Sequence, residues 1–182
     1  MRQVNIIVVA RIGAFWFTSP PVFGDSNTET EDDVTDIMKV FEKHPYGVAI
    51  LDTDNDGDLE CLTAVRTKYD NDGPTADYVW VLKGLKGHVK KNITYHFEKG
   101  DAPDKAFVTI DDDDGQMQEA RALYDDYQTC AVLEFPYKRN PRCMLWTTDE
   151  VKDNVPSECT EQFRKKCAVE VVVYDKESCS QV

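Results

Sequence analysis

The chain has 182 residues, and its 34 Asp and Glu outnumber its 21 Lys and Arg, which gives a formal net charge of −13. A nucleic-acid-binding protein needs a positive surface to displace counterions from phosphates. No basic run here exceeds three residues, so we expect no nucleic-acid partner. The hydrophobic fraction of 41% and the aromatic fraction of 10% are ordinary for a globular protein and argue against intrinsic disorder. The length suits one domain.

The first 24 residues have the order of a secretory signal peptide. A basic start is followed by an apolar stretch over residues 4–17, by Pro20-Pro21, and by small or permitted residues before Asp25. Because Arg11 interrupts the apolar stretch, a buried N-terminal strand is the alternative. We expect residues 1–24 to be removed and residues 25–182 to form a secreted, strongly acidic domain, a charge that favours cationic partners. No later segment approaches the ~20 apolar residues of a transmembrane helix, so no membrane partner is expected.

All six cysteines are expected to form disulfides, because secretion places them in an oxidising compartment. The chain has no Cys-x-x-Cys motif, and its three histidines lie far from the cysteines in sequence, so we expect no zinc site. The spacing alone does not choose among the possible pairings of Cys61, Cys130, Cys143, Cys159, Cys167 and Cys179.

Two helices are predicted, one on each side of a series of strands. Residues 31–43 place Val34, Ile37, Met38 and Phe41 at i, i+3, i+4 and i+7, which is the spacing of an amphipathic helix, and acidic residues lie at the N-terminal end. A second helix is predicted over residues 157–166, followed by a late strand over residues 167–174.

Eight runs rich in Val, Ile, Thr and aromatic residues are predicted to be strands: 46–52, 59–69, 76–84, 88–98, 105–111, 116–124, 127–136 and 142–148. They are separated by short turns rich in Asp, Asn, Gly and Pro, which indicates antiparallel neighbours. Closing such a meander removes its exposed edges. The sequence therefore predicts a mainly β fold, an eight-stranded up-and-down barrel.

The run 88–98 alternates most clearly. Its expected inward set is Val89, Lys91, Ile93, Tyr95 and Phe97, and the outward set includes Asn92. Since Asn92-Ile93-Thr94 is a glycosylation sequon on a polar face of a secreted chain, Asn92 is a candidate glycan attachment site.

The segment Asp52 to Asp58 reproduces the first half of an EF-hand calcium loop, with oxygen ligands at alternate positions and Gly57 for the turn. The second half fails, because Thr63 takes the place of the bidentate Glu and strand-like residues flank the loop. We favour an acidic turn between the first two strands, with weak calcium binding as the alternative. The run Asp111 to Asp114 is interpreted as a solvated turn.

Three segments near the C-terminus carry a family resemblance: Cys-Met-Leu-Trp-Thr-Thr-Asp over residues 143–149, Val-Pro-Ser-Glu-Cys over 155–159, and Tyr-Asp-Lys-Glu-Ser-Cys over 174–179. Phe163, Cys167, the opening helix, Cys61 and Cys130 fall in the same family order. On these residues the chain resembles the tick salivary lipocalins, typified by the histamine-binding proteins. The match spans nearly the whole mature chain and is loose between residues 70 and 125.

The resemblance implies an eight-stranded lipocalin barrel that holds a small host mediator. We also expect a monomer and no cofactor. The resemblance also implies the disulfides Cys61–Cys179 and Cys130–Cys159 and, for the remaining two cysteines, Cys143–Cys167. Amine-binding members place a Glu two residues before the tryptophan of the eighth strand and an Asp after the cysteine of the seventh. In this chain those positions hold Met144 and Ala131.

If Ala131 faces inward, Leu133 and Phe135 do so as well, and the lining is apolar. Such a lining suits a fatty acid, sterol or eicosanoid. The carboxylate of a fatty acid or eicosanoid could contact Arg142, Tyr95 or Lys91. An interior acid could still come from Glu119, Asp125 or Asp126. The candidate ligand-binding residues are Tyr46, Trp80, Tyr95, Phe97, Ala131, Leu133, Met144 and Trp146. The alternative for each of them is a place in the packed core.

No hydrolase, metalloprotease or phosphate-loop motif is present in the sequence, so a binding protein is expected rather than an enzyme. The leading hypothesis is a scavenger of histamine or serotonin, by resemblance, or of a lipid mediator such as a leukotriene, by the residues at positions 131 and 144. The hypothesis of a different class is a lipocalin that inhibits a host protein through its loops.

Overall fold

The computed structural model describes residues 34–182, so the expected signal peptide lies outside the described residues. The elements are α1 (Ile37–Lys43), β1 (Tyr46–Asp52), β2 (Thr63–Asp70), β3 (Thr75–Leu82), β4 (Lys91–Lys99), β5 (Lys105–Ile110), β6 (Gln118–Asp125), β7 (Cys130–Tyr137), β8 (Asn140–Thr147), α2 (Ser157–Lys166), β9 (Val171–Val172) and α3 (Lys176–Cys179). None of the described helices has the length and apolar character needed to cross a membrane.

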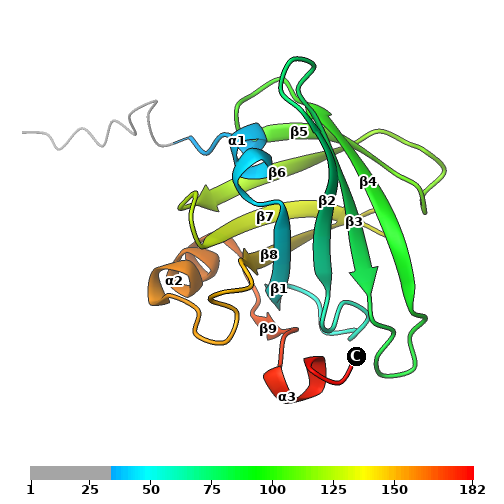
Figure 1. Ribbon diagram of the computed structural model, residues 1–182, viewed down its shortest axis with the longest axis vertical. Coiled ribbons are helices and arrows are strands. Elements are labelled where there is room, and N and C mark those ends of the chain that lie inside the picture. Colours follow the sequence, from blue (N-terminus) through cyan, green and yellow to red (C-terminus); the bar gives the residue numbers. More distant parts are fainter. Residues whose placement is uncertain (1–33) are drawn as a thin grey trace, which may run out of the picture. The chain divides into compact units, whose positions relative to one another are not determined.

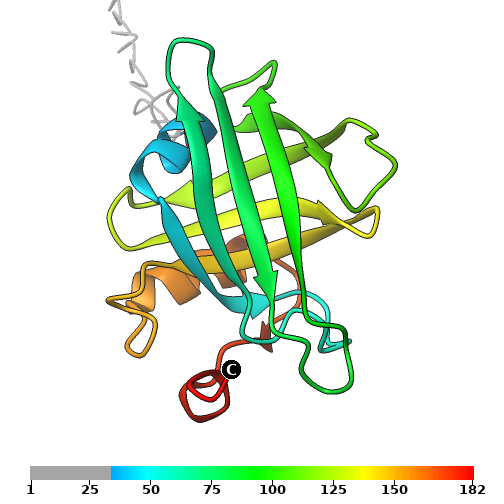
Figure 2. The same ribbon diagram turned by 45° about the vertical axis from the view of Figure 1, so that its right-hand side comes forward.

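Strands β1 to β8 close into an antiparallel up-and-down barrel (Figures 1 and 2). Each strand from β2 to β7 pairs with the next one in sequence, and β1 closes the ring by pairing with both β2 and β8. In Figure 2 the strands β1 to β4 cross in front of β6 to β8. The predicted mainly β, eight-stranded barrel with a short N-terminal helix and a C-terminal helix is therefore confirmed.

The barrel core is built by the alternation of side chains along each strand. In β3 the residues Ala76, Tyr78, Trp80 and Leu82 are buried, and the residues between them are partly exposed. On β7 the predicted inward positions are confirmed, because Ala131, Leu133 and Phe135 belong to the interior cluster. Cys130 and Val132 pack in a second cluster on the outer face of the barrel.

Two predicted inward positions at the start of the run 88–98, Val89 and Lys91, are wrong. The strand begins at Lys91 rather than at residue 88, so Val89 lies in the preceding loop with 74% of its surface exposed. Lys91 is partly exposed and forms an ion pair with Asp112. Ile93, Tyr95 and Phe97 do enter the core, and Asn92 is exposed as predicted.

Helix α1 lies against one end of the barrel (Figure 1). Its N-terminus is capped by the carboxylate of Asp36, and Ile37, Val40 and Phe41 are buried in the interior cluster. Val34 was predicted on the apolar face, but the helix begins three residues later and Val34 is exposed. The Arg66 guanidinium on β2 donates to the carbonyls of Phe41 and Glu42, which fixes the C-terminal end of the helix to the barrel.

Helix α2 packs on the outside of the barrel, as Figure 1 shows, and occupies the predicted range. Its buried Phe163 contributes to the outer cluster. The predicted strand over residues 167–174 is reduced to β9, which pairs with only two residues of β1. All six cysteines are paired, and the disulfides Cys61–Cys179, Cys130–Cys159 and Cys143–Cys167 are the ones that the family resemblance implied.

Candidate ligand-binding cavity

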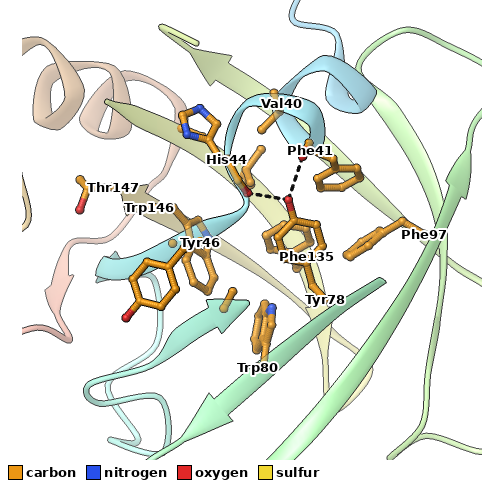
Figure 3. Close-up of a pocket in the computed structure, with 14 residues that line it drawn as sticks. Val40, Phe41, His44, Tyr46, Tyr78, Trp80, Phe97, Phe135, Trp146 and Thr147 are labelled. Carbon is orange, nitrogen blue, oxygen red and sulfur yellow. Dashed lines mark hydrogen bonds between the residues drawn. The ribbon is translucent and has the colours of Figure 1, made fainter. Parts of the chain in front are cut away.

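A small cavity of about 40 Å³ lies inside the barrel next to α1. The helix and its C-cap contribute Val40, Phe41 and His44, and the strands supply the remaining walls (Figure 3). Most of these strand residues are aromatic or small and apolar. The full set is Tyr46, Gly47, Ala64, Tyr78, Trp80, Phe97, Ala131, Leu133, Phe135, Trp146 and Thr147.

The aromatic side chains of this cavity pack against one another. The ring centroids of Phe41 and Phe97 lie 4.6 Å apart, those of Trp80 and Trp146 lie 5.4 Å apart, and Phe135 lies between the two groups. Faces of aromatic rings carry partial negative charge, so this arrangement suits another aromatic ring or an organic cation.

Trp146 stands in the wall beside Gly47, with which it makes a close contact. A Cβ atom at position 47 would lie 3.1 Å from the Trp146 ring, so glycine makes room for the indole. The indole N–H of Trp146 is buried and has no acceptor among the described residues. An unpaired buried donor costs about 1–3 kcal/mol, which a ligand with an acceptor atom would offset.

His44 and Asp125 form a polar pair at the edge of the cavity. The cross-strand register pairs Asp125 with Ala131 and Ala131 with Trp146, both of which line the cavity. Asp125 has no exposed side-chain surface, and its two carboxylate oxygens lie 3.1 and 3.0 Å from Nε2 of His44. Only the first oxygen has hydrogen-bond geometry, which leaves Oδ2 as a buried acceptor without a donor.

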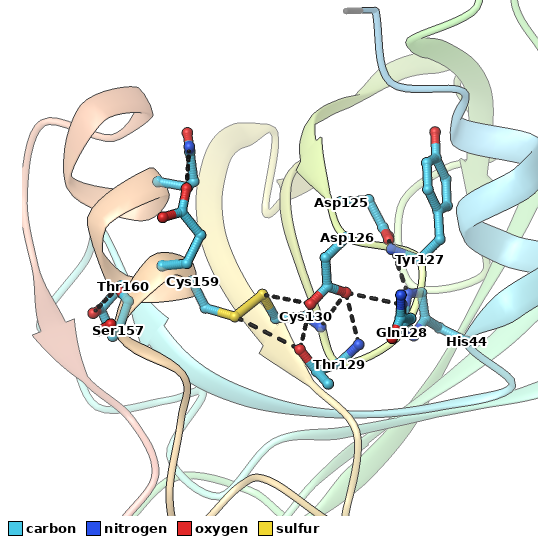
Figure 4. Close-up of a disulfide and its surroundings, with 12 residues drawn as sticks. His44, Asp125, Asp126, Tyr127, Gln128, Thr129, Cys130, Ser157, Cys159 and Thr160 are labelled. Atoms are coloured by element: carbon cyan, nitrogen blue, oxygen red, sulfur yellow. Dashed lines mark hydrogen bonds and ion pairs between the residues drawn. A yellow bond between two sulfur atoms is a disulfide. The ribbon is translucent and has the colours of Figure 1, made fainter.

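The turn that follows Asp125 holds this carboxylate in place (Figure 4). The Tyr127 N–H donates to Asp125, and the carboxylate of Asp126 accepts from the backbone N–H groups of Gln128, Thr129 and Cys130. Burial opposes ionisation of Asp126, but the hydrogen bonds from Thr129 and the backbone outweigh it and lower the pKa of the carboxyl. Asp126 is thus occupied in its own turn, and Asp125 alone of the three candidate acids reaches the interior.

Tyr78 is another polar side chain of the cavity, and its hydroxyl already has hydrogen-bond partners. It donates toward the carbonyls of His44 and Phe41, at 2.7 and 3.1 Å, as Figure 3 shows. Burial raises the pKa of Tyr78, so the phenol stays neutral and serves to hold the end of α1.

Six of the eight predicted ligand-binding residues line the cavity, namely Tyr46, Trp80, Phe97, Ala131, Leu133 and Trp146. Met144 is fully buried in the packed interior outside it. Tyr95 lines a different hollow of about 150 Å³ beside the β7–β8 turn, where its hydroxyl donates to the carbonyl of Pro136. Glu119 is paired with Lys105 near the surface.

Arg142 faces the interior, but it cannot meet a ligand carboxylate, because four aspartates surround it. Its guanidinium bridges Asp52 and Asp58, which are buried, and Asp54 and Asp56, which are partly exposed. Burial alone would lower the pKa of Arg142, and the four carboxylates more than offset that effect and raise it. The guanidinium thus takes the central position that the calcium alternative would give to an ion.

A larger hollow of about 410 Å³ lies outside the barrel, between β1 and β2 and the C-terminal segment. Its charged side chains are largely paired with one another, as in Lys152 with Asp149 and Lys176 with Asp153. It is a solvent-filled groove, whereas the smaller interior cavity combines aromatic walls with buried polar atoms that lack partners.

Sequence reasoning missed the contribution of α1 to the cavity. Phe41 was predicted on the apolar face of the helix, and no role was predicted for His44. A histidine at a helix C-cap followed by Pro45 gives no local sign of a partner 81 residues away. Phe135 could be predicted, since period-two alternation placed it on the inner face of its strand. Asp125 was one of three acids considered for the interior.

Comparisons with known proteins agree with this arrangement. A family model described as tick histamine binding protein matches residues 23–181. The fold is similar to japanin from Rhipicephalus appendiculatus bound to cholesterol, with a TM-score of 0.54 and 15% identity over 73% of this chain and 94% of japanin. It is also similar to AM182 in a serotonin complex, with a TM-score of 0.56 and 18% identity over 76% of this chain and 88% of AM182. No curated protein sequence matches the chain. Since the family match covers the whole barrel, this chain belongs to the tick histamine binding protein family, a family of ligand-binding proteins rather than enzymes.

Proposed function

We propose that this chain is a secreted lipocalin that sequesters a small aromatic amine, such as histamine or serotonin, and so removes an inflammatory mediator of the host. The observation that carries the proposal is the buried carboxylate of Asp125 beside an aromatic cavity. Burying an ammonium group is prohibitive without a paired charge, and Asp125 supplies that charge from a position other than 131 or 144. The rings of Phe41, Phe135 and Trp146 would contact the aromatic part of the amine.

The size of the cavity favours a small ligand over a sterol or an eicosanoid. Sites for drug-sized ligands measure roughly 300–1,000 Å³. At about 40 Å³, the interior cavity must expand to hold any ligand. A compact amine requires the rearrangement of fewer packed aromatic side chains than a lipid does.

A lipid mediator is the second candidate, because the walls of the cavity are almost entirely apolar. The similar fold of japanin, which is described bound to cholesterol, supports this alternative for the barrel in general. Arg142 is held by aspartates, so a fatty acid would bury its carboxylate without a free cation at that place.

Secretion, a monomeric state and a glycan at Asn92 belong to the same proposal. Three disulfides are typical of an extracellular domain. The side chain of Asn92 is exposed on the outside of β4, where a glycan would not enter the cavity. Mass measurement of the secreted protein before and after glycosidase treatment tests the modification.

Titration calorimetry of the mature chain with histamine, serotonin, a leukotriene and cholesterol tests the ligand class. We expect saturable binding of an amine and at least a tenfold loss of its affinity in Asp125→Asn, because truncating one partner of a buried charge pair costs about 2–5 kcal/mol. Asp72→Asn makes the same charge change on an exposed turn and serves as the control. Tight binding of a lipid with no response to amines would contradict the amine assignment, and circular dichroism of both variants would verify folding.

A further inference from the structure

The net charge of the His44–Asp125 pair determines whether an ammonium group can bind beside it. Asp125 is a buried acid beside the cavity, behind His44, which lines it, and both of its carboxylate oxygens lie within 3.1 Å of His44 Nε2. A protonated His44 therefore already neutralises this carboxylate. An ammonium group that arrives beside the pair would leave one uncompensated positive charge in a largely buried site, which is unfavourable.

We propose that an amine ligand and the proton on His44 compete for Asp125, so that binding of the amine releases a proton and acidification releases the amine. This inference rests on the proposed function, and it adds a regulation that the function does not require. Because a proton is exchanged for the ligand, the competition makes the affinity for the amine depend on pH.

The other charged groups around His44 do not remove this competition. Arg66 of β2 is directed to the carbonyls of Phe41 and Glu42, and Lys43 of α1 pairs with Glu42 on the surface. Tyr78 of β3 donates its neutral hydroxyl to the His44 carbonyl. In the β6–β7 turn, Asp126 is saturated by its own turn and Tyr127 contributes a backbone N–H.

His44 also has the right exposure for proton exchange. Its side chain is 13% exposed, whereas the carboxylate behind it has no exposed surface. The proton can thus leave to solvent while the carboxylate remains shielded for the amine.

Calorimetry with serotonin in two buffers of different ionisation enthalpy measures the protons released on binding. Serotonin is the suitable probe because, unlike histamine, it has no imidazole that titrates in the same range. Between pH 5.5 and 8, we expect release to approach one proton per ligand at the acidic end, with affinity falling up to about tenfold per pH unit on acidification.

The variant His44→Gln keeps an N–H donor toward Asp125 but cannot carry a proton. We expect it to show no proton release and an affinity for serotonin that is independent of pH. His96→Gln, which removes an exposed histidine bound by Asp77 and Asp111, should retain the wild-type proton release.

The outcomes separate the inference from the function on which it rests. Saturable binding without proton release, or the same pH dependence in wild type and His44→Gln, would overturn the competition and leave amine binding intact. Absence of amine binding at every pH would overturn both. A folded His44→Gln that binds serotonin with unchanged proton release would place the titrating group elsewhere and contradict the proposal.

Discussion

Arg142 is the basic side chain on which one end of the barrel depends. It lies 5% exposed among four carboxylates, two of which, Asp52 and Asp58, are almost completely buried. Lys138 pairs with Asp58 from the neighbouring β7–β8 turn. Because β1 runs from α1 to the loop that contains these aspartates, the network closes the barrel at the end opposite the cavity.

Replacing Arg142 should therefore destabilise the protein strongly. In Arg142→Met the buried carboxylates lose their counter-ion, and we expect the free energy of unfolding to fall by about 3–5 kcal/mol in chemical denaturation. Arg139→Met removes pairs with Asp113 and Asp114 from an exposed guanidinium that water screens, so its effect should be much smaller than that of Arg142→Met. Similar losses in the two variants would show that the aspartates are solvated without Arg142.

His96 gives the outer surface a small dependence on pH. Burial is the largest single effect and lowers its pKa, but the hydrogen bonds and charges of Asp77 and Asp111 together outweigh burial, so the pKa is raised above the usual 6.5. Its stabilising effect is fully present below pH 6.5 and is lost as the pH rises through the higher folded-state value.

We expect His96→Gln to lower the free energy of unfolding at pH 6 but not at pH 8.5. The effect should stay below about 1 kcal/mol, since the ring is 42% exposed and water screens the pairs. Urea denaturation of both proteins at the two pH values measures the difference. A larger loss at the alkaline pH would contradict the sign.

At the scale of elements, the C-terminal segment is held to the barrel more by covalent bonding than by packing. Strand β9 pairs with β1 through two residues, and α3 buries no side chain. Cys61–Cys179 joins this segment to the β1–β2 loop and spans 118 residues of sequence. Apart from these contacts, the noncovalent attachment depends mainly on Val173, which is buried in the interior cluster and shares backbone hydrogen bonds with Ile50 and Cys61.

Removing Cys61–Cys179 should lower the free energy of unfolding more than removing either of the other two disulfides. The double variant Cys61→Ala/Cys179→Ala should lose about 4–5 kcal/mol in the chain-entropy model, and Cys143→Ala/Cys167→Ala, whose cysteines are 24 residues apart, about 3.5 kcal/mol. Hydrogen exchange should show faster exchange over residues 171–179 in the first variant alone. Equal protection of that segment in both variants would mean that noncovalent contacts hold it.

Helix prediction shows why boundaries are harder to predict than element types. The range 157–166 was correct because Pro156 gives a local start signal. The first helix was predicted six residues too early, since an acidic run resembles a helix N-terminus while Asp36 alone caps it. The late strand was shortened for a different reason, because only two of its residues find a partner on β1.

In the whole molecule, the acidic charge has two different environments. Asp125 lies buried beside the cavity and contacts His44, and Asp52 and Asp58 form ion pairs with Arg142 at the opposite end. Most other acids described lie in turns or in surface pairs, such as Asp112 with Lys91. Most of the net charge of −13 thus comes from acids on the surface, which favour solubility, rather than from acids near the cavity. One buried carboxylate is sufficient for the proposed amine site.

The sequence by itself determined the barrel, because period-two alternation and turn residues are local signals, and its likeness to a known family implied the disulfide pairing. It also indicated most of the aromatic walls, since inward positions follow from the register of a single strand, as for Ala131, Leu133 and Phe135. Only the tertiary structure decided which polar groups meet. His44 reaches Asp125 across 81 residues and Arg142 collects aspartates from a loop more than 80 residues earlier, and both contacts depend on barrel closure. That is why the interior acid came from position 125 and why Arg142 is not available to a ligand.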